Sequence, residues 1–277
     1  MLIVATAVLV SAASVFRSEV LDILPTAMLP ISAREQYVLA LRLAGIADTP
    51  AGRNWLAGAT AQRWDVPVRR GQRIVIDAPG AAGVFIDLVD LETFHTLAST
   101  APGSTHLAYV ATSDHPVAAR VQPPIGGVLP ATVERRVEPS LTFPIQGMTG
   151  RAAHASFGAP RDAGRRRHEG IDLFAARGTP VVAAADGWVT RQTSNRLGGN
   201  VVWVWSPSLR ISTYYAHLER QAVGPGNRVH AGDVIGYVGN TGNARGTAPH
   251  LHFGVYAMLD GAIDPFPFVH EPALAPR

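Results

Sequence analysis

The feature that most constrains the fold of this chain is its division into short apolar runs bounded by glycine, proline and small polar residues. The 277 residues include 27 Gly and 21 Pro. The runs between them are rich in Val and Thr, which favours pleated strands over long helices. Hydrophobic residues make up 47% of the chain and charged residues 16%, so there is enough apolar material for packed cores. We therefore expect a folded, mainly β protein.

The first half shows two patterns in succession. Residues 32–61 carry Tyr37, Leu39 and Leu43 before a break at Thr49-Pro50, and they predict a helix, a turn and a second helix. Strand-sized runs follow, each bounded by turn residues, at 73–76, 84–89, 106–110 and 117–121. We interpret residues 32–122 as an N-terminal accessory domain, a helical hairpin followed by a small β-sandwich.

A stiff and then flexible stretch separates this region from the second half. Pro123-Pro124 is followed by Gly126-Gly127, a composition typical of connections between domains. We expect a linker over 123–142 and a second domain over 143–270. Its predicted strands lie at 181–184, 187–190, 201–205, 211–215, 234–238 and 251–256. Two domains suit the length of the chain.

The N-terminal residues have the pattern expected of an export signal. Residues 1–16 are nearly all apolar or small, a run shorter than the roughly 20 residues that a membrane-spanning helix needs. Such a run fits the core of a signal peptide, so residues 1–22 are expected to be a signal peptide or a short membrane anchor. The protein would then be exported to the periplasm or the cell envelope, and it would meet the membrane only through this segment.

Charge and cysteine content exclude several kinds of site. All 24 basic residues are Arg, and the net charge of +3 is spread along the sequence. This distribution suits an approach to an anionic polymer but does not favour a nucleic-acid site. Because there is no cysteine, a thiolate zinc site and a cysteine nucleophile are excluded. Any metal must be held by His, Asp or Glu.

Histidines recur in strand-like surroundings near the C-terminus. In His250-Leu251-His252 the strand period of two puts both imidazoles on one face, about 6.5 Å apart along the chain. Two such residues are close enough to serve one centre. The alternative is a pair of partly exposed strand histidines without a shared role.

A second group has a different spacing. His168 and Asp172 would lie about 13 Å apart in a straight strand, too far to bind one ion. The backbone must therefore bend, and Gly170 permits a bend. The ordinary alternative is a surface loop beside the arginines at 165–167. His, Asp and His together would meet the need of a catalytic zinc for three N/O ligands and an open position. His217 and one of the 250/252 pair are then candidates for proton transfer.

These motifs together resemble a known family. The order and spacing of His168-x-Gly170-x-Asp172, Tyr215-Ala-His217-Leu218, Gly239-Asn-Thr-Gly242 and Pro249-His-Leu-His252-Phe253 are similar to those of the lysostaphin-like zinc peptidoglycan endopeptidases. The resemblance extends over about residues 143–267. It implies a compact antiparallel β domain of the duplicated-hybrid-motif type, with zinc on His168, Asp172 and His252 and with His217 and His250 as catalytic partners.

The function that the resemblance implies is a zinc metalloendopeptidase that hydrolyses peptide bonds in bacterial peptidoglycan. Peptidoglycan peptides would be its substrate, and envelope division or amidase proteins its partners. The chain departs from the family pattern at loop 243–248, which is longer, and at Gly254, where an acidic residue is common. Both departures bear on substrate preference.

Three rival functions remain. Relatives of the family that have lost zinc ligands regulate amidases by binding them, but here all five positions are filled. A protein that binds the cell wall without turnover is the second rival, and an intact zinc site is hard to explain for it. The segment from Gly232 to Gly239 resembles the hairpins of biotinyl- or lipoyl-carrier modules. Carriers need an attachment Lys, and this chain has none.

Overall fold

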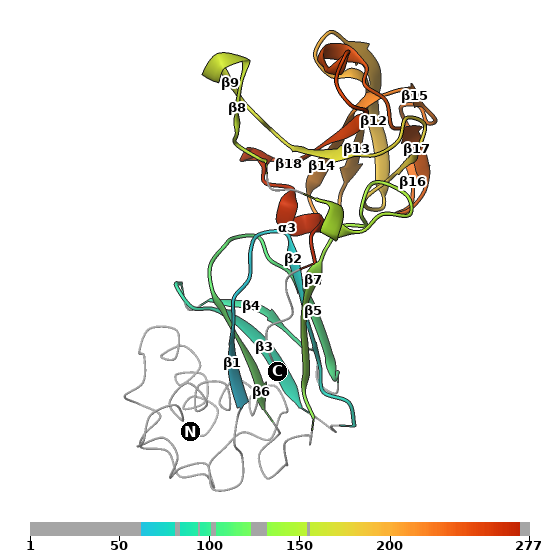
Figure 1. The fold of residues 1–277 in the computed structure, drawn as a ribbon. Coiled ribbons are helices and arrows are strands. Elements are labelled where there is room, and N and C mark those ends of the chain that lie inside the picture. The colour runs from blue at the N-terminus through green and yellow to red at the C-terminus, as the bar shows by residue number, and fades with distance from the viewer. Residues whose placement is uncertain are drawn as a thin grey trace, which may run out of the picture. The chain divides into compact units, whose positions relative to one another are not determined.

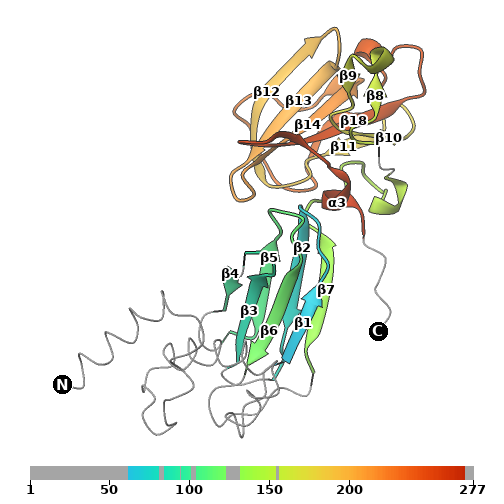
Figure 2. The ribbon, with the colours of Figure 1, turned by 90° about the vertical axis from the view of Figure 1, so that its left-hand side faces the viewer.

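The computed structural model describes residues 62–80, 84–93, 95–100, 104–122, 132–153 and 156–271. These residues form antiparallel sheets with few helical turns (Figures 1 and 2), which confirms the predicted mainly β class. The expected helical hairpin at 32–61 and the expected signal or anchor segment at 1–22 lie outside the described residues. Among the residues that are described, no helix has the length and apolar character needed to cross a membrane.

The chain divides into two compact units. Among the described residues, the first comprises those within 62–67, 75–108 and 115–135, and the second comprises those within 68–74, 109–114 and 136–271. The expected boundaries at 122 and 143 stay a prediction. The expected linker contains a strand, since residues 134–139 pair within a sheet.

The first unit is built on a four-stranded antiparallel sheet in which strand β3 is buried along its whole length. The strand order is β1 (Gln62–Val66), β6 (Val117–Gln122), β3 (Phe85–Asp90) and β4 (Thr96–Ser99). A three-stranded sheet, each strand of which contains residues of both units, has the order β5 (His106–Val110), β2 (Gln72–Asp77) and β7 (Glu134–Pro139). Ile76, Ile86 and Leu88 are fully buried, so apolar side chains close this unit's core.

The second unit contains the longest strands. Its main sheet has the order β10 (Ile171–Phe174), β18 (His250–Ala257), β14 (Ile211–Leu218), β13 (Gly199–Ser206), β12 (Gly187–Asn195) and β16 (Arg228–Val229), and β19 (Gly261–Ile263) also pairs with β18. A smaller sheet has the order β11 (Pro180–Val182), β17 (Val234–Tyr237) and β15 (Arg220–Gln221).

Short elements complete this unit. They are the two-stranded sheet of β8 (Pro160–Arg161) and β9 (Arg166–Arg167), the 3₁₀ turns η4 (Gly150–Ala152), η5 (Asp162–Gly164) and η6 (Gly242–Ala244), and helix α3 (Phe266–Val269). The β8–β9 hairpin projects beside the main sheet (Figure 1).

Side chains along β14 and β18 point alternately to the two faces of the sheet, and one face is buried in the core. Tyr215 and Phe253 are fully buried and pack on one another, with 5.4 Å between ring centroids. The Tyr215 hydroxyl accepts a hydrogen bond from the Ala184 N–H at 2.8 Å. Because successive strand residues point to opposite faces, Tyr214 and His252 lie on the other face. The core therefore fixes the strands, and the opposite face is left for chemistry.

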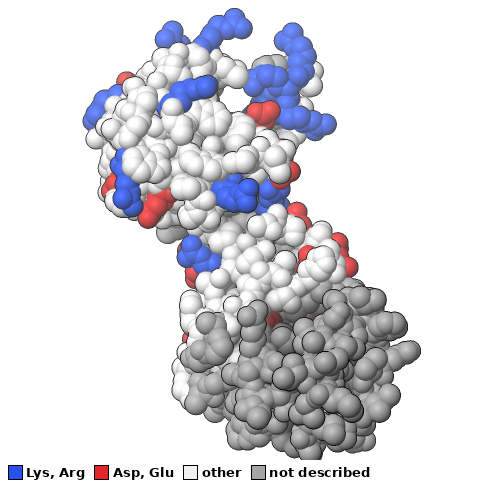
Figure 3. Space-filling model, turned by 180° about the vertical axis from the view of Figure 1, so that it is seen from behind, with Lys and Arg blue, Asp and Glu red and all other residues white. Residues whose placement is uncertain are grey.

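Arginine side chains are dispersed over the second unit. Figure 3 shows them at several separate places on one face rather than in one continuous patch. The chain's basic character thus has no single focus on that face.

Candidate metal centre

The site lies where β10, β18 and β14 run side by side. Asp172 on β10 is directly opposite His252 on β18, and His252 is opposite Ala216 on β14. His168 precedes β10, and its backbone N–H donates to the Ala159 carbonyl at 2.9 Å. The chain thus leaves the strand direction between residues 168 and 171, as the spacing of His168 and Asp172 required.

Gly170 makes this bend fit against β18. A Cβ at residue 170 would lie 2.5 Å from the Phe253 carbonyl oxygen and 2.7 Å from His252 Nε2. No side chain larger than a hydrogen fits there without moving the His252 ring. The glycine inside the His-x-Gly-x-Asp motif is therefore explained by close approach of the two strands.

Three side-chain atoms form a nearly equilateral triangle. His168 Nε2 is 3.1 Å from Asp172 Oδ1 and 3.0 Å from His252 Nδ1, and the last two atoms are 3.2 Å apart. A tetrahedral zinc with bonds of about 2.0–2.1 Å needs its ligand atoms about 3.3 Å apart. Two imidazole nitrogens and one carboxylate oxygen are also ligands that zinc favours. The donor set and its spacing fit a zinc ion, and no other such group occurs among the residues that the structure describes.

Backbone carbonyls orient the histidines around this triangle. The Nδ1 atoms of His168, His217 and His250 lie 3.0, 2.9 and 2.8 Å from the carbonyl oxygens of Ser156, Thr241 and Ala248. A carbonyl can only accept, so in each ring Nδ1 carries the proton and Nε2 keeps its lone pair. This is the tautomer that a metal ligand or a general base requires.

All five residues singled out in the sequence come together here. His250 Nε2 is 3.9 Å from Asp172 Oδ1, and the His217 ring is 5.1 Å from the His250 ring and 5.9 Å from the His252 ring, measured between centroids. His168, His217 and His250 are buried. The five side chains thus form one polar cluster at the edge of an apolar core.

The protonation states agree with metal binding. Burial raises the pKa of the Asp172 carboxyl, but its close polar contacts with the His168 and His252 rings outweigh that effect and hold the pKa well below its usual range. Burial lowers the pKa of His252. Burial together with the neighbouring His252 and His250 lowers the pKa of His217 to about 4. The low pKa values favour an anionic Asp172 carboxylate and neutral His217 and His252 rings.

His217 occupies an unusual backbone conformation. Asn200 pairs with Leu218 whereas Val202 pairs with Tyr215, so β14 carries one extra residue in this stretch. His217 lies inside this bulge with φ of 61°, a left-handed conformation that costs a non-glycine residue about 1–2 kcal/mol. Strain of this kind is typical of functional residues that the surrounding structure holds in place.

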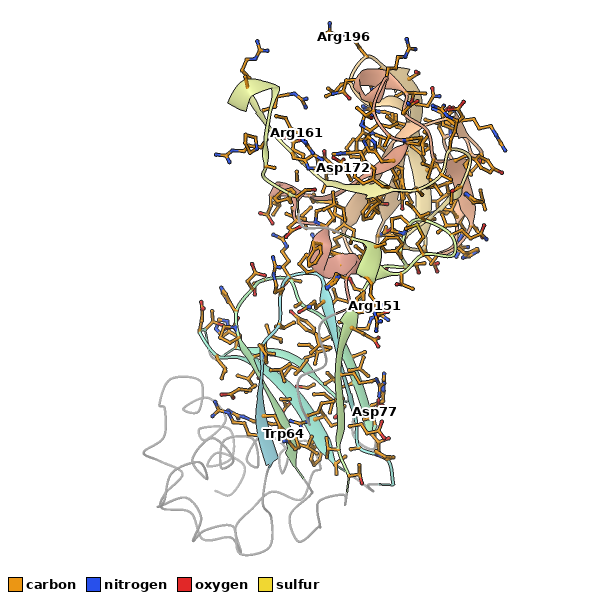
Figure 4. All side chains as sticks on the ribbon, in the orientation of Figure 1. Trp64, Asp77, Arg151, Arg161, Asp172 and Arg196 are labelled. Atoms are coloured by element: carbon orange, nitrogen blue, oxygen red, sulfur yellow. The ribbon has the colours of Figure 1, made fainter. Side chains whose placement is uncertain are left out.

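Two neighbours of the cluster had no signal in the sequence pattern. Arg161 on β8 reaches Asp172 (Figure 4). The Tyr214 ring packs edge-on against His252, with 5.8 Å between centroids. Arg161 lies outside every motif, and Tyr214 reads as an ordinary strand aromatic. Alternation along β14 could have placed Tyr214 on the face of His252, but nothing local pointed to Arg161.

Comparisons with known proteins concern this unit. Residues 166–265 match the model of Peptidase family M23. The peptidoglycan DD-endopeptidase ShyC of Vibrio cholerae is 43% identical over 88 residues, which are 32% of this chain and 20% of ShyC. The L-Ala--D-Glu endopeptidase of Bacillus subtilis is 37% identical over 140 residues, which are 45% of this chain and 41% of that protein.

Part of this chain is also similar to solved structures. The catalytic domain of the antimicrobial peptidase lysostaphin from Staphylococcus simulans is 32% identical, with a TM-score of 0.38, and the match covers 42% of this chain and 90% of that domain. The chain spans about a fifth to two fifths of the length of the two curated relatives named above.

Proposed function

We propose that this chain is a zinc metalloendopeptidase that hydrolyses peptide bonds in bacterial peptidoglycan, because residues 166–265 match the model of Peptidase family M23. The observation that carries the proposal is the triangle of His168 Nε2, Asp172 Oδ1 and His252 Nδ1, with edges of 3.0–3.2 Å. The two relatives named above, a peptidoglycan DD-endopeptidase and an L-Ala--D-Glu endopeptidase, support the same class of substrate.

The residues divide into two roles under this proposal. His168, Asp172 and His252 hold the zinc, which when bound supplies Lewis acidity to the attacking water and the scissile carbonyl. His217 and His250 handle protons at Nε2, because their Nδ1–H groups are already bonded to the carbonyls of Thr241 and Ala248. One imidazole accepts the proton of the attacking water, and a proton is then delivered to the leaving amine.

The wider assignment rests on the same proposal. Residues 143–270 are proposed as the peptidase domain, 123–142 as the connection, 32–122 as an accessory domain and 1–22 as a signal peptide or short anchor. The protein would act in the periplasm or elsewhere in the cell envelope, where peptidoglycan lies. Division or amidase proteins are the proposed partners.

Hydrolysis of purified sacculi by the full chain tests the proposal. Soluble peptide fragments with newly freed amines are expected with zinc present. They should disappear after chelation and return when zinc is added back. A protein that binds sacculi and zinc but releases no fragments would favour the non-hydrolytic alternative, a cell-wall binder or a regulator of amidases. An amidase added to the same assay would separate these two, since only a regulator changes its rate.

A further inference from the structure

Arg161 contacts only one of the two carboxylate oxygens of Asp172, so the two oxygens have different partners. Its Nη2 donates to Asp172 Oδ2 at 2.7 Å, while Oδ1 faces His168 Nε2 at 3.1 Å and His252 Nδ1 at 3.2 Å. Figure 4 shows Arg161 entering from the β8–β9 hairpin toward the strand that carries Asp172. One oxygen is thus turned to the triangle and the other to the arginine.

The second contact of Arg161 has a different character. Its Nη2 is 3.2 Å from His168 Nδ1, but Nδ1 is also 3.0 Å from the Ser156 carbonyl oxygen. When Nδ1 carries a proton and donates it to that carbonyl, it cannot also accept from Arg161. The guanidinium is therefore directed to Asp172 in the tautomer that leaves His168 Nε2 as a ligand.

The pair contributes little to folding. The Arg161 side chain is 40% exposed and that of Asp172 20%, and exposed ion pairs contribute about 0–1 kcal/mol. A carboxylate beside a zinc ion, however, can bind through one oxygen or through both. Binding through both would occupy a position that a catalytic zinc keeps open. The hydrogen bond from Arg161 to Oδ2 favours binding through Oδ1 alone.

We propose that Arg161 is a positioning residue that withholds Asp172 Oδ2 from the metal, so that the carboxylate binds through Oδ1 alone and one coordination position stays open. The inference rests on the proposed function and adds to it. Residues that orient metal ligands from outside typically change activity or affinity by roughly 10- to 100-fold. Arg161 acts through Asp172 and needs no contact with the substrate.

The test uses the full chain loaded with cobalt as a spectroscopic probe of coordination. Arg161→Ala is compared with Arg167→Ala, which removes an arginine of the same hairpin whose Nη1 donates to the Gly158 carbonyl. Arg161→Ala should shift and weaken the visible absorption of bound cobalt, as a further oxygen ligand would, while Arg167→Ala keeps the wild-type spectrum. X-ray absorption of the zinc form should show the same added ligand.

Kinetics provide the second readout. Arg161→Ala should keep about one zinc per chain yet lose roughly 10- to 100-fold in kcat, and Arg161→Lys should recover part of the loss because an ammonium still donates to Oδ2. Unchanged spectra and kcat in Arg161→Ala would overturn the inference. So would a loss of zinc without a spectral change at saturation. If the wild-type chain itself binds neither metal, the proposed function fails and the role of Arg161 with it.

If Arg161→Ala does not fold, the spectrum of Arg161→Lys decides. Arg161→Met is the comparison, because Met cannot donate a hydrogen bond to Oδ2 whereas Lys can. Equal cobalt spectra for the two variants would contradict the positioning role of Arg161.

Discussion

In the first unit, Asp87 lies on β3 with its Oδ1 bonded to the Ser99 hydroxyl at 2.6 Å, whereas in the second unit Asp172 lies on β10 with Oδ1 turned to a point shared with two histidines. Both carboxylates belong to antiparallel sheets over apolar cores. Asp87 pairs with the strands beside it, since Ser99 and Arg120 are its cross-strand neighbours. Asp172, in contrast, contacts His168, which precedes β10, and His252 on β18.

The two units differ in how surrounding groups orient the polar side chains. In the second unit, carbonyls of Ser156, Thr241 and Ala248 hold the far side of three imidazoles, which leaves the near side for a ligand or a proton. In the first unit, Asp90 Oδ1 accepts N–H groups of Glu92 and Thr93 and its Oδ2 meets His115. Those polar atoms bond to one another and so fix a loop.

The largest expected effect separates two histidines of one strand. His252→Ala removes a ligand and should abolish zinc binding together with activity. His250→Ala keeps all three ligands, so zinc should stay near one per chain while turnover drops roughly 10²- to 10⁴-fold. Zinc content and hydrolysis of sacculi, measured on the same preparations, check this. The reverse pattern would exchange the two roles, and zinc with full activity in both variants would move the site elsewhere.

A substitution at Gly170 should damage the second unit through packing alone. Gly170→Ala inserts a methyl group against the Phe253 carbonyl and the His252 ring, and such overpacking costs about 1–3 kcal/mol. Zinc affinity should fall with stability because the ring must move. Gly224→Ala is the matched control, since nothing lies within 4 Å of its added carbon. Equal denaturation midpoints and zinc affinities for both variants would contradict the close approach.

The first unit should respond to pH through Asp87. Burial raises the pKa of this carboxyl to about 6, against the Ser99 hydrogen bond and the Arg120 charge. A raised pKa means that the folded state is favoured while Asp87 is protonated and loses stability as the pH rises through about 6. Between about pH 4.5 and 7.5 the loss is about 2 kcal/mol, because each pH unit between about 4.5 and the raised pKa of about 6 costs about 1.4 kcal/mol.

Asp87→Asn removes this titration. The stability of the variant relative to wild type should therefore grow from about pH 4.5 to about pH 7.5, as urea unfolding followed in both proteins would show. A difference that stays constant with pH would mean that Asp87 is ionised throughout.

The smallest expected effect concerns the backbone at His217. Both His217→Gly and His217→Ala remove the imidazole and should lose activity alike. Glycine relieves the left-handed strain at φ of 61°, whereas alanine keeps it, so the glycine variant should be more stable by roughly 1 kcal/mol. Thermal unfolding of the two variants measures the difference. An alanine variant as stable as the glycine variant would show that the bulge stores no strain.

Sequence patterns predicted the long strands well and the short ones poorly. The runs at 201–205 and 211–215 became β13 and β14, which are longer by a few residues at their ends. Strand β10 and the β8–β9 hairpin had no prediction, because two to four residues carry too little periodicity.

For the site, strand alternation identified the shared face of His250 and His252, and the distance argument required a bend at Gly170. The sequence pattern could not identify Arg161, because its contact with Asp172 depends on how the β8–β9 hairpin folds back over β10. Nor could it find the carbonyls that orient the rings, since any residue supplies a carbonyl and only tertiary structure aims it. The sequence therefore predicted which residues form the site, but it did not predict how their side-chain atoms are oriented.

The central claim is that one zinc ion binds to His168 Nε2, Asp172 Oδ1 and His252 Nδ1. Anomalous diffraction at the zinc edge, on crystals of the full chain grown with zinc, tests it most directly. We expect a single strong peak about 2.0–2.1 Å from each of these three atoms, with Asp172 Oδ2 still bonded to Arg161. A peak bonded to a different set of side chains, or no peak at this triangle in zinc-loaded crystals, would contradict it.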